Sequence, residues 1–121
     1  MVMATFLYMA YDVDLADRVG TVLHDEHCSF VEKKMMGGLC FMVNGKMCVG
    51  IVKDSLMVRI DPQLHEASLQ KLGCREMDFT GRPMKGFVFV SPEGIDNEDD
   101  LRYWVRLALD FNPKAKSSRK K

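Results

Sequence analysis

Several features that would point directly to a function are missing from this chain of 121 residues. It has four cysteines, at positions 28, 40, 48 and 74, and no two of them form a Cys-x-x-Cys pair. Such wide spacing is typical of reduced thiols, and unlike a zinc ribbon or a disulfide framework. Gly37-Gly38 lacks the spacing of a phosphate-binding loop. We therefore expect free thiols, no metal and no cofactor.

Long hydrophobic runs are missing as well. No apolar stretch approaches the length that crosses a bilayer as a helix. Residues 1–11 are apolar, but they lack the basic start and the cleavage site of a signal peptide. We therefore expect a cytoplasmic protein with no membrane segment, in which residues 1–8 form an extension or arm.

A net charge is also missing, because 17 basic residues balance 17 acidic ones. The distribution is uneven, however. The last eight residues, 114–121, hold five basic side chains and no acid, so the rest of the chain has 17 − 5 = 12 basic against 17 acidic residues. A nucleic-acid domain carries a basic face, which an acidic body does not favour. We expect residues 113–121 to be a disordered basic tail, suited at most to weak, salt-sensitive contact with nucleic acid.

The sequence does contain two strong helical patterns. The first begins at Asp12 or Asp14, either of which can cap it, and the second is capped by Asp96, with Asp99 three residues on. In both, apolar residues recur at the spacing of one buried helical face. These residues are Leu15, Ala16, Val19, Val22 and Leu23 in the first helix, and Leu101, Trp104, Val105, Ala108 and Phe111 in the second.

Between these helices the chain predicts strands, most clearly around Asn44-Gly45, which favours a two-residue type I′ hairpin. That turn pairs Val43 with Lys46 and Met42 with Met47, and predicts the further pairs 41 with 48 and 40 with 49. One face of the hairpin then carries Leu39, Phe41, Val43, Cys48 and Gly50, and the other carries Cys40, Met42, Met47, Val49 and Ile51. Both faces are largely apolar, so helices can cover one, while the other needs more helix, a partner subunit or a ligand.

The second half of the chain predicts a turn near Asp54-Ser55, a strand at 56–60, short strands at 75–79 and 86–90, and a loop at 80–83. A helix opens at Asp61-Pro62, because Asp is a good N-cap and Pro suits the first helical position. Its apolar positions are Leu64, Ala67, Leu69 and Leu72, and it stops at Gly73. The fold class is α+β: a two-layer sandwich with a mostly antiparallel sheet, in the order α-β-β-β-β-α-β-β-α.

Five stretches of this sequence together resemble the TfoX N-terminal domain family, also called TfoX/Sxy. They are MAYD at 9–12 with LADRV at 15–19, EKKMMGGL at 32–39, FMVNGKMCVG at 41–50, LMVR at 56–59, and MDFTGRPMKGF at 77–87. The likeness covers about 9–111, so we expect one domain at 9–112. Met36 stands where the family has an aromatic residue. The resemblance implies a two-layer α/β fold and a bacterial protein, similar to the N-terminal part of TfoX competence regulators but without their C-terminal domain.

The candidate binding residues are cationic: Lys33, Lys34, Arg59, Arg82 and Lys85. Arg59 lies within an apolar strand, so it needs either a carboxylate partner, such as Asp61 or Asp78, or a bound anion. The alternative to an ion pair is an anion pocket built by Arg59 and Arg82.

Two other groups of residues carry weaker signals. His27-Cys28 suggests a thiol–imidazole nucleophile, yet neighbours in sequence do not face each other on a helix. His24 and Cys28 are four residues apart, but two ligands do not make a metal site. His65, near a helix start, is expected to face solvent. The ten methionines either fill the core or line a self-association surface.

No catalytic constellation emerges from these residues. We therefore expect a non-enzymatic regulatory or adaptor domain that acts by protein contact, as a homodimer through an apolar sheet face. The alternatives are a nucleic-acid-associated accessory protein that uses the basic tail with Lys33 and Lys34, and a small anion-binding protein or small enzyme that uses Arg59 and Arg82.

Overall fold

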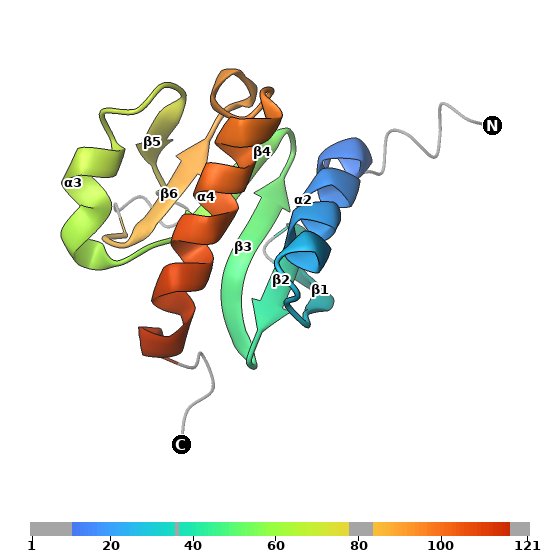
Figure 1. Ribbon diagram of the computed structural model, residues 1–121. Coiled ribbons are helices and arrows are strands. Elements are labelled where there is room, and N and C mark those ends of the chain that lie inside the picture. The colour runs from blue at the N-terminus through green and yellow to red at the C-terminus, as the bar shows by residue number, and fades with distance from the viewer. Residues whose placement is uncertain (1–10, 36, 78–83, 117–121) are drawn as a thin grey trace.

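The computed structural model describes residues 11–35, 37–77 and 84–116. Six antiparallel strands form one sheet in the order β1-β2-β3-β4-β6-β5 (Figure 1). The α+β class, the antiparallel sheet and the predicted element order are confirmed. The strands are β1 Val31–Met35, β2 Gly38–Val43, β3 Lys46–Val52, β4 Ser55–Arg59, β5 Cys74–Glu76 and β6 Phe87–Val90, and the helices are α2 Val13–Asp25, α3 His65–Ser68 and α4 Glu98–Phe111.

Helices α2 and α4 lie side by side across one face of the sheet (Figure 1). Their apolar stripes enter the main core, in which Trp104 and Phe41 are among the largest fully buried side chains. All the buried positions predicted for α2 are confirmed, as are Leu101, Trp104, Val105 and Ala108 of α4, whereas Phe111 at its end is only partly buried. None of the described helices is long and apolar enough to cross a bilayer.

The predicted N-cap is confirmed for α2 but not for α4. The carboxylate of Asp12 accepts from the N–H groups of Asp14 (2.9 Å) and Leu15 (3.2 Å), as expected. The prediction that Asp96 caps α4 was wrong. Asn97 does so, accepting from the Asp99 N–H at 2.7 Å, because α4 begins at Glu98 and Asn97 is the residue directly before it, with the extended backbone of an N-cap.

The Asn44-Gly45 hairpin forms with positive φ at both residues (55° and 76°), as a type I′ turn requires. The pairs nearest the turn are confirmed, but the predicted pairs 41 with 48 and 40 with 49 were wrong: Phe41 pairs with Val49, and Cys40 with Gly50. Cys48 is the extra residue of a β-bulge, which resets the alternation of side chains along β3.

The bulge also changes which residues share a face. Val49 and Ile51 join the helix-covered core, although they were predicted on the other face. Gly50 joins Cys40 on that other face instead, and a Cβ atom there would lie 2.9 Å from Met57 Cε. The next turn is one residue earlier than predicted, at Lys53 and Asp54, because Val52 pairs with Ser55.

The helix predicted from Asp61 is much shorter than expected. Asp61 caps it by accepting from the Gln63 N–H (2.9 Å), but a 3₁₀ turn at Pro62–Leu64 is followed by the single turn of α3. The buried residues are His65 and Ser68, whereas Leu64 and Leu72 are exposed. The predicted stop at Gly73 was wrong: α3 ends at Ser68, and Gly73, with a φ of 79°, lies in the turn just before β5. Strand β5 ends at Glu76, and the predicted loop at 80–83 lies outside the described residues.

Candidate functional site

The predicted cationic set is spread over the sheet. Lys33 and Lys34 lie on edge strand β1, on opposite faces, because they pair with Cys40 and Leu39. Arg59 lies on β4, three strand spacings away, which is about 14 Å. Lys85 directly precedes Gly86, whose carbonyl accepts from the Ile60 N–H at the same end of β4 as Arg59. The structure thus brings Lys85 to the Arg59 end of β4 and leaves Lys33 and Lys34 apart; Arg82 lies outside the described residues.

Arg59 is half-buried, and the partners described for it are neutral. Its guanidinium donates to the Lys116 carbonyl (2.9 Å) and, at 3.5 Å, to that of Met47, and it stacks over the Phe87 ring at 5.3 Å. Burial lowers the pKa of this guanidinium, while the nearby Cys48 opposes the shift. Asp61 caps Gln63 instead of pairing with Arg59, and Asp78 lies outside the described residues.

The thiol and imidazole groups near residue 28 do not form a nucleophile. Cys28 Sγ donates to the Ser29 carbonyl at 3.6 Å. Burial, together with the charge of Glu26, raises the pKa of the Cys28 thiol, whereas a catalytic thiol needs the opposite shift. His27 has a φ of 57°, just beyond the end of α2. Within the described ranges, no group of three metal-ligating side chains is present.

The exposure of His65 was predicted wrongly. It was expected to face solvent, yet it is only 3% exposed. Its Nδ1 accepts from the Gly86 N–H (2.9 Å), so Nε2 carries the proton and donates to Glu76 Oε1 at 2.9 Å. Both ring nitrogens are thus used in joining α3 to β5 and to the start of β6, and neither is left to transfer a proton to a substrate.

The sheet face opposite α2 and α4 carries a second apolar cluster, which we call the methionine face. Its centre is already buried: Met57 is 1% exposed, while Met42 and Met47 remain half-exposed. No residue of a described helix belongs to it. Its members are Met35, Cys40, Met42, Met47, Val52, Met57, Met77, Phe87 and Phe89.

Cations lie at the edges of the methionine face. One row of paired residues crosses all six strands, from Lys33 on β1 through Met57 to Phe89 and Arg75 on β5. Arg75 stacks over the Phe89 ring at 5.0 Å and donates to Ser55 Oγ at 3.0 Å. The row is therefore apolar at its centre and positive at both ends.

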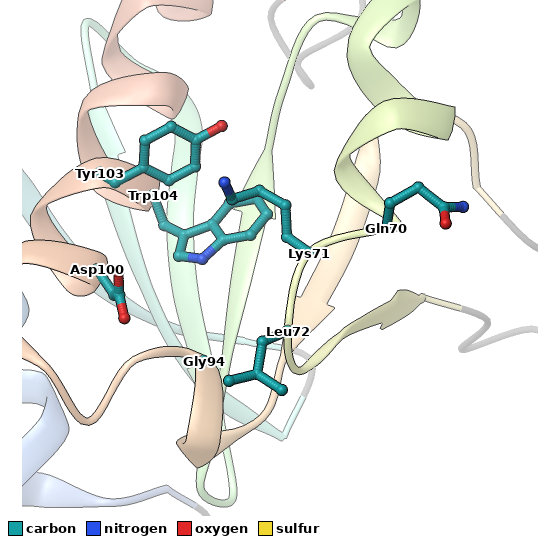
Figure 2. Close-up of a pocket in the computed structure, with 7 residues that line it drawn as sticks. All are labelled: Gln70, Lys71, Leu72, Gly94, Asp100, Tyr103 and Trp104. Carbon is teal, nitrogen blue, oxygen red and sulfur yellow. The ribbon is translucent and has the colours of Figure 1, made fainter.

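A recess lies on the other side of the sheet, between α4 and the loop that precedes β5 (Figure 2). Its volume is about 440 Å³, within the range of small binding sites. In Figure 2 the Lys71 side chain reaches toward the aromatic rings of Tyr103 and Trp104, and its Nζ is 4.5 Å from the centre of the Tyr103 ring. Sequence reasoning missed this recess, which is lined by Gln70, Lys71, Leu72, Gly94, Asp100, Tyr103 and Trp104.

Comparison with known proteins identifies a family for this chain. The family model for the TfoX N-terminal domain matches residues 25–112, which is 88 of 121 residues. The chain belongs to the TfoX N-terminal domain family. No curated protein and no solved structure matches the chain.

The family match places both surfaces within the shared domain. It begins at the last residue of α2 and ends just after α4, so it includes the whole sheet and the recess beside Tyr103. The resemblance to the family is therefore confirmed, although the first of the five stretches, at 9–19, lies before the matched residues.

Proposed function

We propose that this TfoX N-terminal domain is a non-enzymatic regulatory or adaptor module that acts by protein contact, and that the methionine face joins two copies of the chain as a homodimer. The observation that carries this proposal is the methionine face itself. Unbranched methionine side chains adapt to many shapes and recur on protein-binding surfaces. Here five of them share a sheet face to which no described helix contributes.

The charges on this face fit a contact between proteins. Lys33 and Arg75 lie at the two ends of the central row, on the outer strands of the sheet. Charges at the rim of an interface stay hydrated and contribute little, whereas the desolvated centre supplies most of the affinity. A cytoplasmic location belongs to the same proposal, because all four cysteines are free thiols, as in a reducing compartment. The regulatory part is supported by family membership.

Sedimentation velocity across micromolar concentrations tests the dimer. We expect a concentration-dependent dimer for the unmodified chain and a monomer for Met42→Glu and Met47→Glu, because each places a charge on the half-exposed part of the methionine face. Val13→Glu is the matched control: Val13 is an exposed apolar residue at the start of α2, where an acid suits the helix dipole. A monomer at every concentration would exclude the homodimer.

A second candidate function is binding of a small anion beside Arg59. It is favoured by one observation: this half-buried guanidinium has carbonyl and aromatic partners but no carboxylate among the described residues. A thermal-shift titration with phosphate and citrate tests it. We expect both anions to raise the melting temperature of the unmodified chain and to leave Arg59→Leu unchanged; if Arg59→Leu only lowers stability and responds to anions as before, the arginine is structural.

A further inference from the structure

The outward surface of α4 offers an interaction site separate from the methionine face, on the opposite side of the sheet. Among the large apolar side chains described as exposed, Leu72 (69%) and Tyr103 (41%) line the same recess. They come from different elements, the loop before β5 and the middle of α4 (Figure 2). An apolar side chain of a partner can be buried in this hollow, between the two exposed apolar walls.

Tyr103 also borders a second hollow, of about 430 Å³, farther along α4. Leu107 supplies the apolar part of its lining, one helical turn after Tyr103. The ring of Tyr103 is therefore a ridge between two hollows, one on the Leu72 side and one on the Leu107 side. A partner can meet such a ridge with two side chains one helical turn apart, whose Cβ atoms are about 5–6 Å from each other.

The wall opposite Tyr103 is held in place by close backbone packing. A Cβ atom at Gly94 would lie 2.4 Å from the Leu72 carbonyl oxygen, so only glycine allows this approach. Gly73, directly after Leu72, has a φ of 79° and a backbone close to Gly94. The recess is thus preformed, which lowers the entropic cost of filling it.

The charges around the two hollows select the sign of the partner. Arg102 is 3.4 Å from Asp25, and Arg106 is 3.6 Å from Glu26, so acids at the end of α2 already neutralise both arginines. Lys71 is engaged over the Tyr103 ring. Within the described part of the chain, no ion pair is formed by the three lining carboxylates, which belong to Asp99, Asp100 and Asp110. The surface around the two hollows thus carries five acidic residues (25, 26, 99, 100, 110) and three basic residues (71, 102, 106), so its net charge is negative.

We propose that this surface binds a basic amphipathic helix of another protein, which places two apolar side chains one turn apart on either side of Tyr103. The apolar anchors fill the two hollows, and lysine or arginine side chains around them meet the three unpaired carboxylates. Asp99 and Asp100 also stabilise the first turn of α4 through the helix dipole. The apolar hollows locate the site, and the carboxylates determine which partner it accepts.

Binding is best followed from the peptide, because Trp104, which lines the recess, is itself only 1% exposed. A fluorescently labelled alanine–lysine helix with two leucines at i and i+4 is titrated with the full chain while its fluorescence anisotropy is recorded. We expect a saturable change that weakens as salt rises, because screening reduces the attraction between exposed charges. A peptide with glutamate in place of lysine is expected to bind at least about tenfold more weakly.

Variants of exposed residues then locate the contact without disturbing the core. Leu72→Gln and Tyr103→Ala are each expected to weaken binding about tenfold, as the loss of an interface anchor does. Val31→Gln, at an equally exposed apolar residue on edge strand β1, is the matched control and should leave the affinity unchanged. Circular dichroism confirms that each variant is folded. The proposal is overturned if the glutamate peptide binds as well as the lysine peptide, if Val31→Gln or Met42→Glu weakens binding as much as Leu72→Gln, or if no peptide binds.

Discussion

The two faces of the sheet solve the burial of apolar surface in different ways. On one face, α2 and α4 supply whole stripes of side chains, and Trp104 and Phe41 are fully enclosed. On the other, methionines cover one another, and the outer ones remain half-exposed. Branched and aromatic side chains in defined rotamers specify one packing, whereas methionine adapts to what lies against it. The helix-covered face therefore specifies a single packing, whereas the outer methionines of the other face, Met42 and Met47, keep part of their surface exposed.

The largest expected effect is on the helix-covered face. Trp104→Ala should lower the free energy of unfolding by about 3–5 kcal/mol, because it removes a large side chain from an enclosed site. Met42→Ala, on the half-exposed part of the methionine face, should cost less than about 1.5 kcal/mol, since Met42 is only partly buried. Urea denaturation measures both. Equal losses would contradict the difference between the two faces.

The reactivity of two buried cysteines allows the two faces to be compared chemically. Cys48 lies on the helix-covered face, and Cys40 lies on the methionine face. Burial raises the pKa of the Cys48 thiol to about 12, and it also raises the pKa of Cys40. At pH 8, a thiol of pKa about 12 has a thiolate fraction near ~10⁻⁴, so native-state alkylation of Cys48 should be about a thousandfold slower than that of a free cysteine. Mass spectrometry after brief iodoacetamide treatment measures this; rapid labelling of Cys48 in the folded chain would contradict it.

The same shift predicts how stability depends on pH. Above pH 9.0, the unfolded Cys48 thiol ionises while the folded one stays protonated up to about pH 12. The unfolded state then binds fewer protons than the folded state, so stability falls as pH rises through this window. For one thiol the slope is about 1.4 kcal/mol per pH unit. Replacing Cys48 with alanine should flatten this part of the curve, and an unchanged curve would assign it to other groups.

The fourth prediction concerns the junction between α3 and the sheet. His65→Leu should lower the free energy of unfolding by about 1–3 kcal/mol, because it leaves the Gly86 N–H and the Glu76 carboxylate without their partner. His65→Gln, which keeps one donor and one acceptor, should recover part of that loss. Thermal unfolding followed by circular dichroism provides the measurement. If leucine were as stable as histidine, the hydrogen bonds would contribute nothing.

The smallest expected effect tests whether charge or burial holds the helical layer. Arg102→Ala removes the ion pairs between α4 and the end of α2, at 3.4 Å from Asp25 and 3.9 Å from Glu26. Because Arg102 is partly exposed, the loss should be about 0.2–1 kcal/mol, and it should shrink further at high salt. A loss approaching that of Trp104→Ala would mean that these ion pairs organise the layer.

Local patterns in the sequence predicted α2, α4 and the type I′ turn, because capping, 3.6-residue spacing and an Asn-Gly pair act over a few residues. The bulge at Cys48 has no such local pattern, and it is seen only in the pairing of β2 with β3, where Phe41 lies opposite Val49. The burial of His65 depends on Glu76 and Gly86, which are 11 and 21 residues away.

The candidate sites show the same limit. The cationic residues looked like one set in the sequence, but the strand order puts three strand spacings between Lys33 and Arg59. The recess joins Leu72 to Tyr103 from separate elements, so no short motif marks it. Leu72 was predicted as an apolar position of the helix, and its exposure became visible only in the structure.

The hydrogen bond from Arg59 to the Lys116 carbonyl sets a practical limit on how the chain can be shortened. Ala115, one residue earlier, is buried, and the Pro113 carbonyl accepts from Lys46 at 3.4 Å. A chain ending at Phe111 would therefore lose packing and hydrogen bonds together with the basic residues. Any loss of DNA binding in that variant could then come from the altered fold or from the missing charge. Ending the chain after Lys116 removes Arg119, Lys120 and Lys121 and keeps these contacts. A protein that ends at Lys116 therefore tests the role of the last basic residues while the fold stays intact.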